Sequence, residues 1–142
     1  MAPLIEIETE GRKLLFLDDW RFPIDCATYM YQRKVDCEMY HKSWDIVRSF
    51  GSFKEHIINY GVPDVLSIDY DLADVEELRE ELPFEHWFNL DENREYTGLD
   101  CVDWLLKHCF NNDLKFPEYV IHSTNPDGRE KIQELINNFE TF

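Results

Sequence analysis

The sequence predicts a three-layer α/β/α fold, in which helices cover both faces of a parallel sheet. Short apolar runs, which are typical of buried strands, alternate along the chain with longer stretches of helical spacing. Such alternation favours parallel strands joined by right-handed crossovers. Three of the apolar runs also end in polar clusters. In this architecture ligands bind beyond the carboxyl ends of the strands, so these clusters are candidates for a site.

Four strands and four helices are expected. The strands are short runs of aliphatic and aromatic residues at 14–18, 44–48, 65–72 and 119–122. The helices carry apolar residues at intervals of three and four and cover residues 24–33, 49–59, 97–110 and 126–139. Their expected inward residues are Ala27, Met30 and Tyr31, then Phe53, Ile57 and Ile58, then Leu99, Val102, Leu105 and Leu106, then Ile132, Leu135 and Ile136.

Three further segments do not fit this alternation. Residues 4–8 alternate apolar and acidic side chains and are a candidate for an extra edge strand. Residues 35–43 are polar and aromatic without a clear period, so a loop is expected there. Residues 73–97 form a long acidic stretch, which is expected to be an insertion loop that acts as a lid or binding loop.

Size and charge limit the classes of partner. The length of 142 residues indicates one domain over residues 1–142, with its core at about 14–139. The formal net charge of −16 repels nucleic-acid backbones and anionic membranes. Neither a long duplex nor a membrane is therefore expected as a partner, unless a local basic patch or bound cations intervene. A basic protein would be attracted to such a chain.

The remaining bulk features favour a cytoplasmic protein. The four cysteines lie far apart without metal-ligand spacing, which indicates reduced thiols. The first residues lack the basic start and apolar middle of a signal peptide. No segment approaches the roughly 20 apolar residues of a membrane span.

Carboxylates gather at the predicted ends of two strands. Asp69 and Asp71 point to the same side if the third strand stays extended through both. Asp18 and Asp19 follow the first strand, and they converge with Asp69 if the first and third strands are neighbours. A divalent cation, Mg²⁺ or Mn²⁺, best explains such repelling carboxylates in one crevice. The alternative is that Asp19 or Asp71 only caps a turn.

A second polar cluster, residues 122–128, joins the fourth strand to the last helix. The free N–H groups and the dipole at a helix start favour an anion there, so phosphate binding is predicted. Asn125 or Thr124 could instead only cap the helix. His122 is a candidate for proton transfer, although a lone histidine is often a core residue. The predicted phosphate-binding residues are Arg21, Arg48, Ser123, Thr124, Asn125 and Gly128. For the two arginines, the alternative is a surface ion pair.

Four motifs resemble the cyclic-phosphate processing receiver domains, a divergent family of the receiver superfamily. They are Leu17-Asp18-Asp19-Trp20-Arg21, Asp69-Tyr70-Asp71-Leu72, Thr97-Gly98 and residues 122–128. The resemblance implies a flavodoxin-like sheet of order 2-1-3-4 and Mg²⁺ held by the acids after the first and third strands. It also implies action on cyclic nucleotides or cyclic phosphate ends of RNA, in RNA repair or in conflict between phage and host.

One departure from an ordinary receiver shapes the functional hypothesis. The fifth strand and helix, with the phosphate-binding lysine, are missing, so a phospho-acceptor role for Asp69 is disfavoured. The leading hypothesis is a metal-dependent phosphoesterase that opens a cyclic phosphate, with Asp18, Asp19 and Asp69 as metal ligands and His122, Asp69 and Asp71 as catalytic residues. The alternatives are a binder that sequesters a cyclic nucleotide and an acidic inhibitor of a basic protein.

Overall fold

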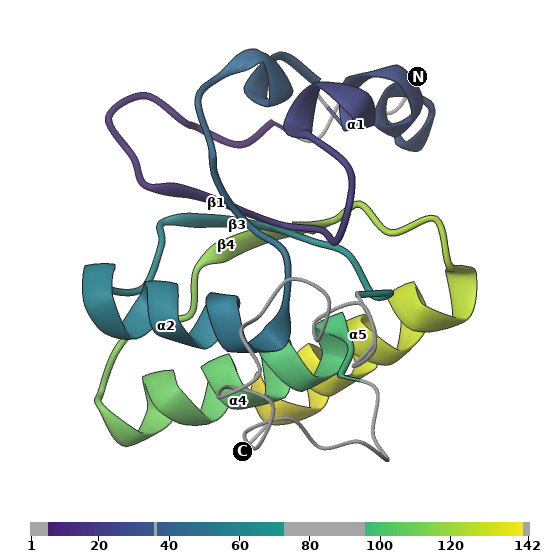
Figure 1. The fold of residues 1–142 in the computed structure, drawn as a ribbon. Helices are drawn as coiled ribbons and strands as arrows, with labels where there is room; N and C mark the ends of the chain where they lie inside the picture. Colours follow the sequence, from purple (N-terminus) through teal and green to yellow (C-terminus); the bar gives the residue numbers. More distant parts are fainter. Residues whose placement is uncertain (1–5, 36, 73–95, 141–142) are drawn as a thin grey trace, which may run out of the picture.

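The computed structural model of the chain describes residues 6–35, 37–72 and 96–140. These residues form a four-stranded parallel sheet with helices on both faces, as Figure 1 shows. The strands follow the order β2-β1-β3-β4. They are β1 (Leu14–Leu17), β2 (Asp45–Val47), β3 (Val65–Ile68) and β4 (Glu118–Ile121). The predicted three-layer fold and strand order are therefore confirmed.

The two central strands are buried over their whole length because helices cover them on both sides. β1 pairs with β3 so that Leu14 lies opposite Val65 and Leu17 opposite Ile68. Every residue of both strands is buried, which explains why each reads as a continuous apolar run. Ser67 is the only polar residue in these two strands, and it is buried as well. Asp18 and Asp69, the residues that follow the strands, consequently lie at the same edge of the sheet.

The helices divide unequally between the two faces (Figure 1). One face carries α1 (Pro23–Met30), the 3-10 turn η1 (Tyr31–Arg33) and the 3-10 helix η2 (Cys37–His41). The other face carries α2 (Phe50–Tyr60), α4 (Gly98–Asn111) and α5 (Pro126–Glu140). Two apolar cores result. The larger core packs α2, α4 and α5 against Leu15, Leu17, Leu66 and Ile68, and the smaller packs α1 and η2 against Phe16 and Val65.

Residues at the helix starts define where several of the helices begin. Ser49 caps α2, because its hydroxyl accepts a hydrogen bond from the Ser52 N–H at 3.1 Å. Asp100 closes the start of α4 by accepting from the Thr97 N–H at 2.8 Å. Proline occupies the first position of α1 and of α5, where its fixed φ and missing N–H are favourable.

Several sequence predictions are corrected in detail. The third strand ends at Ile68 and does not extend through Asp71. Tyr31 and Ile58, predicted to face the core, are 65% and 67% exposed. Residues 35–43, predicted to be a loop, include η2, whose Tyr40 is buried. Residues 6–8 form no strand, and residues 4 and 5 lie outside the described part of the chain, as do residues 73–95 of the predicted insertion loop.

No fifth strand follows β4 in the described part of the chain. β4 is therefore an edge strand of this sheet, with α1 and η1 on one side of it and α5 on the other. Within the described residues, no helix is long and apolar enough to cross a membrane. The four cysteines all lie in the described part of the chain, and none forms a disulfide.

Candidate metal and phosphate site

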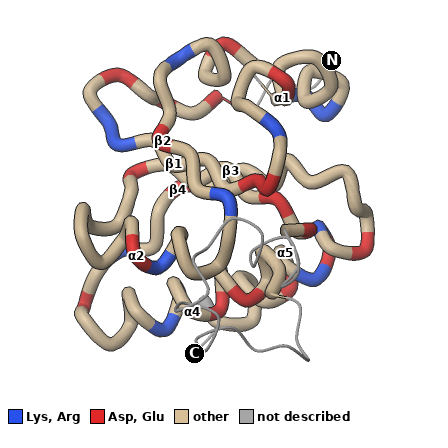
Figure 2. Tube along the Cα trace, in the orientation of Figure 1, with Lys and Arg blue, Asp and Glu red and all other residues tan. Residues whose placement is uncertain are grey.

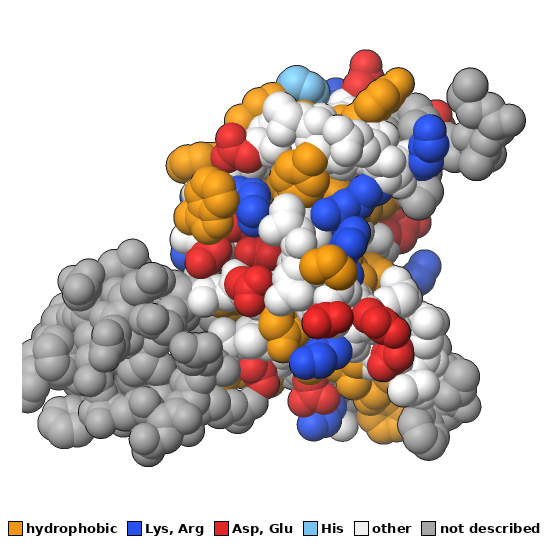
Figure 3. Space-filling model, turned by 90° about the vertical axis from the view of Figure 1, so that its right-hand side faces the viewer, with side chains coloured by type: hydrophobic (Ala, Val, Ile, Leu, Met, Phe, Trp, Pro, Cys, Tyr) orange, Lys and Arg blue, Asp and Glu red, His pale blue; other side chains and the backbone are white. Residues whose placement is uncertain are grey.

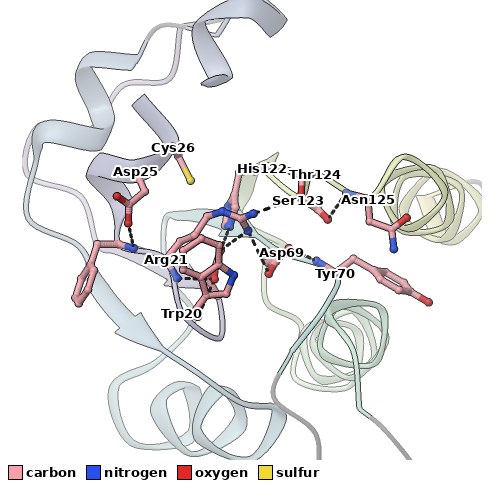
Figure 4. Close-up of polar contacts among 12 residues, drawn as sticks. Trp20, Arg21, Asp25, Cys26, Asp69, Tyr70, His122, Ser123, Thr124 and Asn125 are labelled. Carbon is pink, nitrogen blue, oxygen red and sulfur yellow. Dashed lines mark hydrogen bonds and ion pairs between the residues drawn. The ribbon is translucent and has the colours of Figure 1, made fainter. Parts of the chain in front are cut away.

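The polar residues that follow β1, β3 and β4 meet at the carboxyl edge of the sheet. Figure 2 shows acidic positions gathered where β1 and β3 end. Figure 3 looks onto this end of the molecule and shows basic and acidic side chains mixed across it. The close-up in Figure 4 shows Arg21, Asp69 and His122 converging on one point.

Asp18 is a buried carboxylate that is held by several hydrogen bonds. Its Oδ1 accepts from the backbone N–H groups of Trp20 at 2.9 Å and Arg21 at 2.8 Å. Its Oδ2 lies 2.9 Å from Nε2 of His122. Burial by itself raises the pKa of Asp18, but these hydrogen bonds outweigh it and lower the pKa to about 2. Asp18 is therefore ionised at neutral pH.

Asp69 is a second buried carboxylate, and its environment has the opposite effect. Burial and the nearby charge of Asp18 raise the pKa of Asp69 to about 7. The Tyr70 N–H donates to Oδ1 at 2.9 Å, and the Ser123 hydroxyl also hydrogen-bonds to this carboxylate. Near neutral pH, Asp69 is thus divided between its protonated and ionised forms. A cation beside it would favour the ionised form.

His122 is completely buried and engages both ring nitrogens. Nδ1 lies 2.7 Å from the Ser67 hydroxyl, which lies 2.9 Å from the Tyr40 hydroxyl. The ring stacks on Phe16 with a centroid distance of 4.5 Å and an interplanar angle of 1°. Burial lowers the pKa of His122 despite the opposing effect of Asp18, so the ring is neutral.

The charge of Asp18 determines where the protons lie in this series of hydrogen bonds. An ionised carboxylate only accepts hydrogen bonds, so Nε2 of the neutral His122 carries the proton and Nδ1 accepts from Ser67. The Ser67 oxygen is then free to accept from Tyr40. Burial raises the pKa of the Tyr40 hydroxyl, which stays protonated and can donate. Hydrogen bonds therefore run in one direction, from Tyr40 through Ser67 and His122 to Asp18.

Asp18, Asp69 and His122 form a cluster that could hold a metal ion. One ligand atom from each residue lies within 4.8 Å of the other two. The three residues come from the ends of β1, β3 and β4, so the sheet positions them. The sequence prediction of Asp18 and Asp69 as a converging pair agrees with this geometry. His122 was predicted for proton transfer and not as a ligand.

Arg21 places a positive charge beside the two carboxylates. Its Nη1 lies 3.4 Å from Oδ2 of Asp18 and 3.9 Å from Oδ2 of Asp69. Its Nη2 donates to the Thr124 hydroxyl at 3.3 Å. Arg21 therefore spans from the acid cluster to the loop before α5, as Figure 4 shows. An anion bound in front of the cluster would meet this guanidinium.

Comparison with protein families agrees with this arrangement. The sequence model of the cyclic-phosphate processing receiver domains matches residues 13–138. The chain belongs to this family. No curated protein and no solved structure matches it. The matched region contains β1 to β4, the acid cluster and the loop before α5.

Two acids predicted for the site of this receiver domain, Asp71 and Asp19, lie outside the cluster. Asp71 is exposed, and its Oδ2 accepts from the Asn125 amide at 3.4 Å. The chain turns after Ile68, because the Tyr70 N–H bonds to the Asp69 side chain and does not continue a strand. The condition for Asp69 and Asp71 to point to the same side, a strand extended through both, is therefore not met, and the catalytic role of Asp71 stays a prediction. Asp19 is half-buried and also lies outside the cluster, although its charge contributes to the raised pKa of Asp69.

The arginine after β2 contacts the backbone of the loop that follows β1. Arg48 Nη1 donates to the backbone carbonyls of Asp18, at 3.2 Å, and of Arg21. Its guanidinium also lies 4.8 Å from the ring centre of Phe22. Arg48 therefore holds the loop that carries Asp18 and Arg21. Its predicted role in phosphate binding stays a prediction.

The loop before α5 is arranged mainly by caps. Oδ1 of Asn125 accepts from the Gly128 N–H at 3.0 Å, so Asn125 caps the helix as the alternative interpretation expects. Ser123 is buried and accepts from the Asn125 N–H at 3.1 Å. Thr124 is exposed next to Arg21, which leaves it as the residue of this loop best placed to meet a ligand. Gly128 is buried, and a Cβ there would lie 2.3 Å from the ring of Tyr70.

A second glycine fixes the position of Asp69. A Cβ on Gly98 would lie 1.8 Å from the backbone oxygen of Asp69, so only glycine allows this approach. The Gly98 N–H also donates to the Tyr70 carbonyl at 2.7 Å. The first turn of α4 therefore rests directly on the chain that carries Asp69. The Thr97-Gly98 motif therefore has a structural role, because it allows the start of α4 to pack against the backbone of Asp69.

Two important residues of the site, Ser67 and Tyr40, were missed in the sequence. Ser67 stands alone among apolar residues in the central strand, and a lone polar residue in a buried run requires a partner. That signal was available. Tyr40 lies in a segment without periodicity, and its contact with Ser67 spans 27 residues, so no local pattern indicates it.

Proposed function

We propose that this domain binds a divalent cation at Asp18, Asp69 and His122 and opens a cyclic phosphate of a nucleotide or an RNA end. The observation that carries the proposal is the cluster of three ligand atoms within 4.8 Å, placed beside Arg21. Two buried acids with a guanidinium between them suit a cation and a phosphate together. Family membership supports cyclic phosphate as the class of ligand.

The donor set bears on which cation fits. Carboxylate oxygens suit Mg²⁺ and Mn²⁺, and an imidazole nitrogen in the set shifts the preference toward transition metals. Mn²⁺ accepts both kinds of ligand and is therefore the better match if His122 coordinates. Mg²⁺ is the better match if only Asp18 and Asp69 do. The bound cation would supply a Lewis acid for the phosphoryl oxygen and a lowered pKa for an attacking water.

The chain itself supplies positioning and charge. Arg21 would neutralise the charge that develops on the phosphoryl oxygens, while Thr124 would fix the orientation of the phosphate by a hydrogen bond. The series of side-chain hydrogen bonds from Tyr40 to Asp18 would hold the Asp18 carboxylate in one orientation. Hydrolysis adds water across one P–O bond: phosphorus gains the hydroxyl oxygen, and the ribose oxygen that leaves takes a proton.

The burial of His122 bears on its role in that proton transfer. Its ring is completely buried and both nitrogens have partners within the protein. This geometry favours a residue that positions Asp18 or binds the cation over one that exchanges protons with a substrate. A second function follows from the same observation: a binder that sequesters a cyclic nucleotide without turnover.

Incubation with 2′,3′-cyclic mononucleotides and Mg²⁺ or Mn²⁺, followed by chromatography, separates these functions. Conversion to a 2′- or 3′-phosphomonoester supports hydrolysis, and ligand that is bound but recovered unchanged supports sequestration. Asp69→Asn should abolish conversion, because it removes a charged ligand of the cluster. Asp103→Asn, which changes an acid on the surface of α4 that pairs with Lys107, is the matched control. Absence of both binding and conversion for the parent protein would refute the proposal.

A further inference from the structure

A groove of about 450 Å³ runs along the free edge of β4. Met30 and Arg33 line it from the end of α1 and η1, Tyr119 and Ile121 line it from β4, and Arg129 lines it from α5. β4 continues directly into residues 122–125, so one end of the groove lies next to the loop that carries Thr124. A volume of this size is within the usual range for small-molecule sites, about 300–1,000 Å³.

Two guanidinium groups line this groove although the chain has a net charge of −16. Among the described residues, neither Arg33 nor Arg129 forms an ion pair with a carboxylate. Glu130 lines the groove as well, but it is not paired with either arginine. Burial and the charge of Arg129 both lower the pKa of Arg33, so the two groups lie close enough to repel. An anion between them would relieve this repulsion.

The groove and the acid cluster are connected through one aromatic ring. The guanidinium carbon of Arg33 lies 5.3 Å from the ring centre of Tyr29, and that of Arg21 lies 5.8 Å from it. The Tyr29 hydroxyl donates to the His122 carbonyl at 2.7 Å. Arg33 Nη1 donates to the Ile121 carbonyl at 3.4 Å, which holds its side chain along the strand edge. Basic groups therefore continue from the acid cluster into the groove.

We propose that Arg33 and Arg129 form a second phosphate subsite, so that the ligand is an oligonucleotide end with at least two nucleotides. The terminal phosphate lies at the acid cluster and the preceding phosphate lies between these two arginines. This inference rests on the proposed function and narrows its ligand class. Each guanidinium group can donate two hydrogen bonds to a pair of phosphate oxygens, and the partly exposed Tyr119 ring provides apolar surface for a nucleoside. This is the local basic patch that a strongly acidic chain needs to bind a polyanion.

An acidic peptide would satisfy the same two charges, but two observations favour the nucleotide. The groove adjoins the residues proposed to hold a phosphate. Its wall also carries Tyr119, whose ring suits a base. Binding measurements with a dinucleotide and with an acidic peptide distinguish the two occupants.

The test compares two probes of different length. The first is 2′,3′-cyclic AMP, and the second is the dinucleotide ApA that ends in a 2′,3′-cyclic phosphate. Equilibrium dialysis in Mg²⁺ measures the binding of each, and chromatography records whether each is recovered unchanged. We expect the dinucleotide to bind about tenfold more tightly than the mononucleotide, because it adds one charge-assisted phosphate contact. The affinity of the dinucleotide should also fall more steeply with salt. We expect the slope of log K against log salt concentration to be larger in magnitude than that of the mononucleotide by about 0.7.

Two variants and one control locate the effect. Arg33→Gln and Arg129→Gln should each reduce the preference for the dinucleotide severalfold, and the double variant should remove it. Lys107→Gln makes the same change of charge at an exposed side chain of α4 and should keep the preference in full. Thermal unfolding of each variant establishes that it is folded. The ratio of the two affinities in the parent protein is itself a test that requires no substitution.

Three results would overturn the inference. Equal affinities for the two probes would remove the second subsite while leaving the proposed function intact. A hexaglutamate peptide that binds the groove, with no preference for the dinucleotide, would assign the arginines to an acidic protein partner. Failure of the parent protein to bind or convert either probe would refute the proposed function, and the inference with it.

Discussion

Nε2 of His122 lies 2.9 Å from Oδ2 of Asp18, and both side chains are completely buried. The contact joins the last strand of the sheet to the first across 104 residues of sequence. Nδ1 of the same ring contacts Ser67 in the central strand. One imidazole therefore connects three strands, and its removal should affect the fold as well as the site.

Replacing His122 with glutamine should destabilise the metal-free protein by about 1–3 kcal/mol. Glutamine cannot reach both Ser67 and Asp18 in the geometry of the ring, so at least one buried polar group loses its partner. Urea unfolding of the metal-free variant measures the change. The control is His41→Gln, since His41 is exposed at the end of η2 and should matter little. Equal stability of the two variants would show that the buried hydrogen bonds of His122 contribute nothing to the free energy of unfolding.

The tautomer of His122 should report whether it binds a cation. In the metal-free protein we expect the proton on Nε2, because that nitrogen donates to ionised Asp18. Coordination through Nε2 requires its lone pair, so the proton would move to Nδ1 and be donated to Ser67. Nitrogen chemical shifts of the ring, measured with and without diamagnetic Zn²⁺, distinguish the two forms. A tautomer that does not change while the cation binds would assign coordination to Asp18 and Asp69 alone.

Asp69 should make the stability of the metal-free protein fall as the pH rises. Its folded pKa of about 7 lies above the ordinary value of 3.8. Between these values the folded state binds a proton that the unfolded state has lost, so the free energy of unfolding decreases with pH across this window. Asp69→Asn removes this effect and should be more stable than the parent protein at pH 8, by a few kcal/mol as an order of magnitude.

Unfolding of both proteins between pH 4 and pH 8 provides the measurement. The difference between them should shrink toward the acid end, because protonated Asp69 resembles asparagine. Asp103→Asn, at a solvent-accessible side chain of α4, should track the parent protein at every pH. If the parent and Asp69→Asn show parallel pH dependence, the raised pKa of Asp69 is wrong.

Arg21→Gln should change the binding of cations and anions in opposite directions. The guanidinium lies 3.4 Å from Asp18 and 3.9 Å from Asp69, so it repels a divalent cation that binds there. We expect Mn²⁺ to bind the variant severalfold more tightly, and inorganic phosphate to bind it more weakly. Calorimetric titration with each ion tests this, with Arg12→Gln, which pairs with Glu118, as the control. If neither affinity changes, Arg21 has only a structural role, as the partner of Asp18 and Asp69 in ion pairs.

Two glycine substitutions should have opposite effects on stability. Gly98→Ala would place its Cβ 1.8 Å from the Asp69 carbonyl oxygen, and neither backbone can move without shifting α4. We expect a loss of more than about 3 kcal/mol, or failure to fold. Gly51→Ala meets nothing within 4 Å inside α2, so it should stabilise the protein by up to about 1 kcal/mol. Thermal unfolding of both proteins is the measurement, and a Gly98→Ala protein of parental stability would contradict the close contact.

The strands and the meeting of Asp18 with Asp69 could be predicted because local patterns carry that information. Continuous apolar runs indicate strands that are covered on both faces, and β1 and β3 are such strands. A carboxylate directly after each strand then lies at the shared edge of the sheet. The helices followed from spacing, except that Tyr31 and Ile58 lie just beyond the face that the core covers.

The parts that could not be predicted depend on side-chain direction and on contacts between distant residues. A histidine after a strand can face a ligand or the interior, and the sequence does not distinguish these. Here Phe16 stacks on the His122 ring and Ser67 bonds to it, so it faces inward. The third strand ends before Asp71 because the Tyr70 N–H bonds to the Asp69 carboxylate, a turn that no periodicity encodes.

The strand order also determines when the site can be assembled during synthesis. The two acids come together as soon as β3 pairs with β1, and Asp18 has then not yet gained the imidazole that β4 brings. A nascent chain at that stage holds two repelling carboxylates beside an unpaired edge of its central strand. The arrival of β4 covers that edge and delivers His122 in one step. Completion of the sheet and completion of the cluster of Asp18, Asp69 and His122 thus depend on the same strand, and a chain that is cut before Glu118 would lose both together.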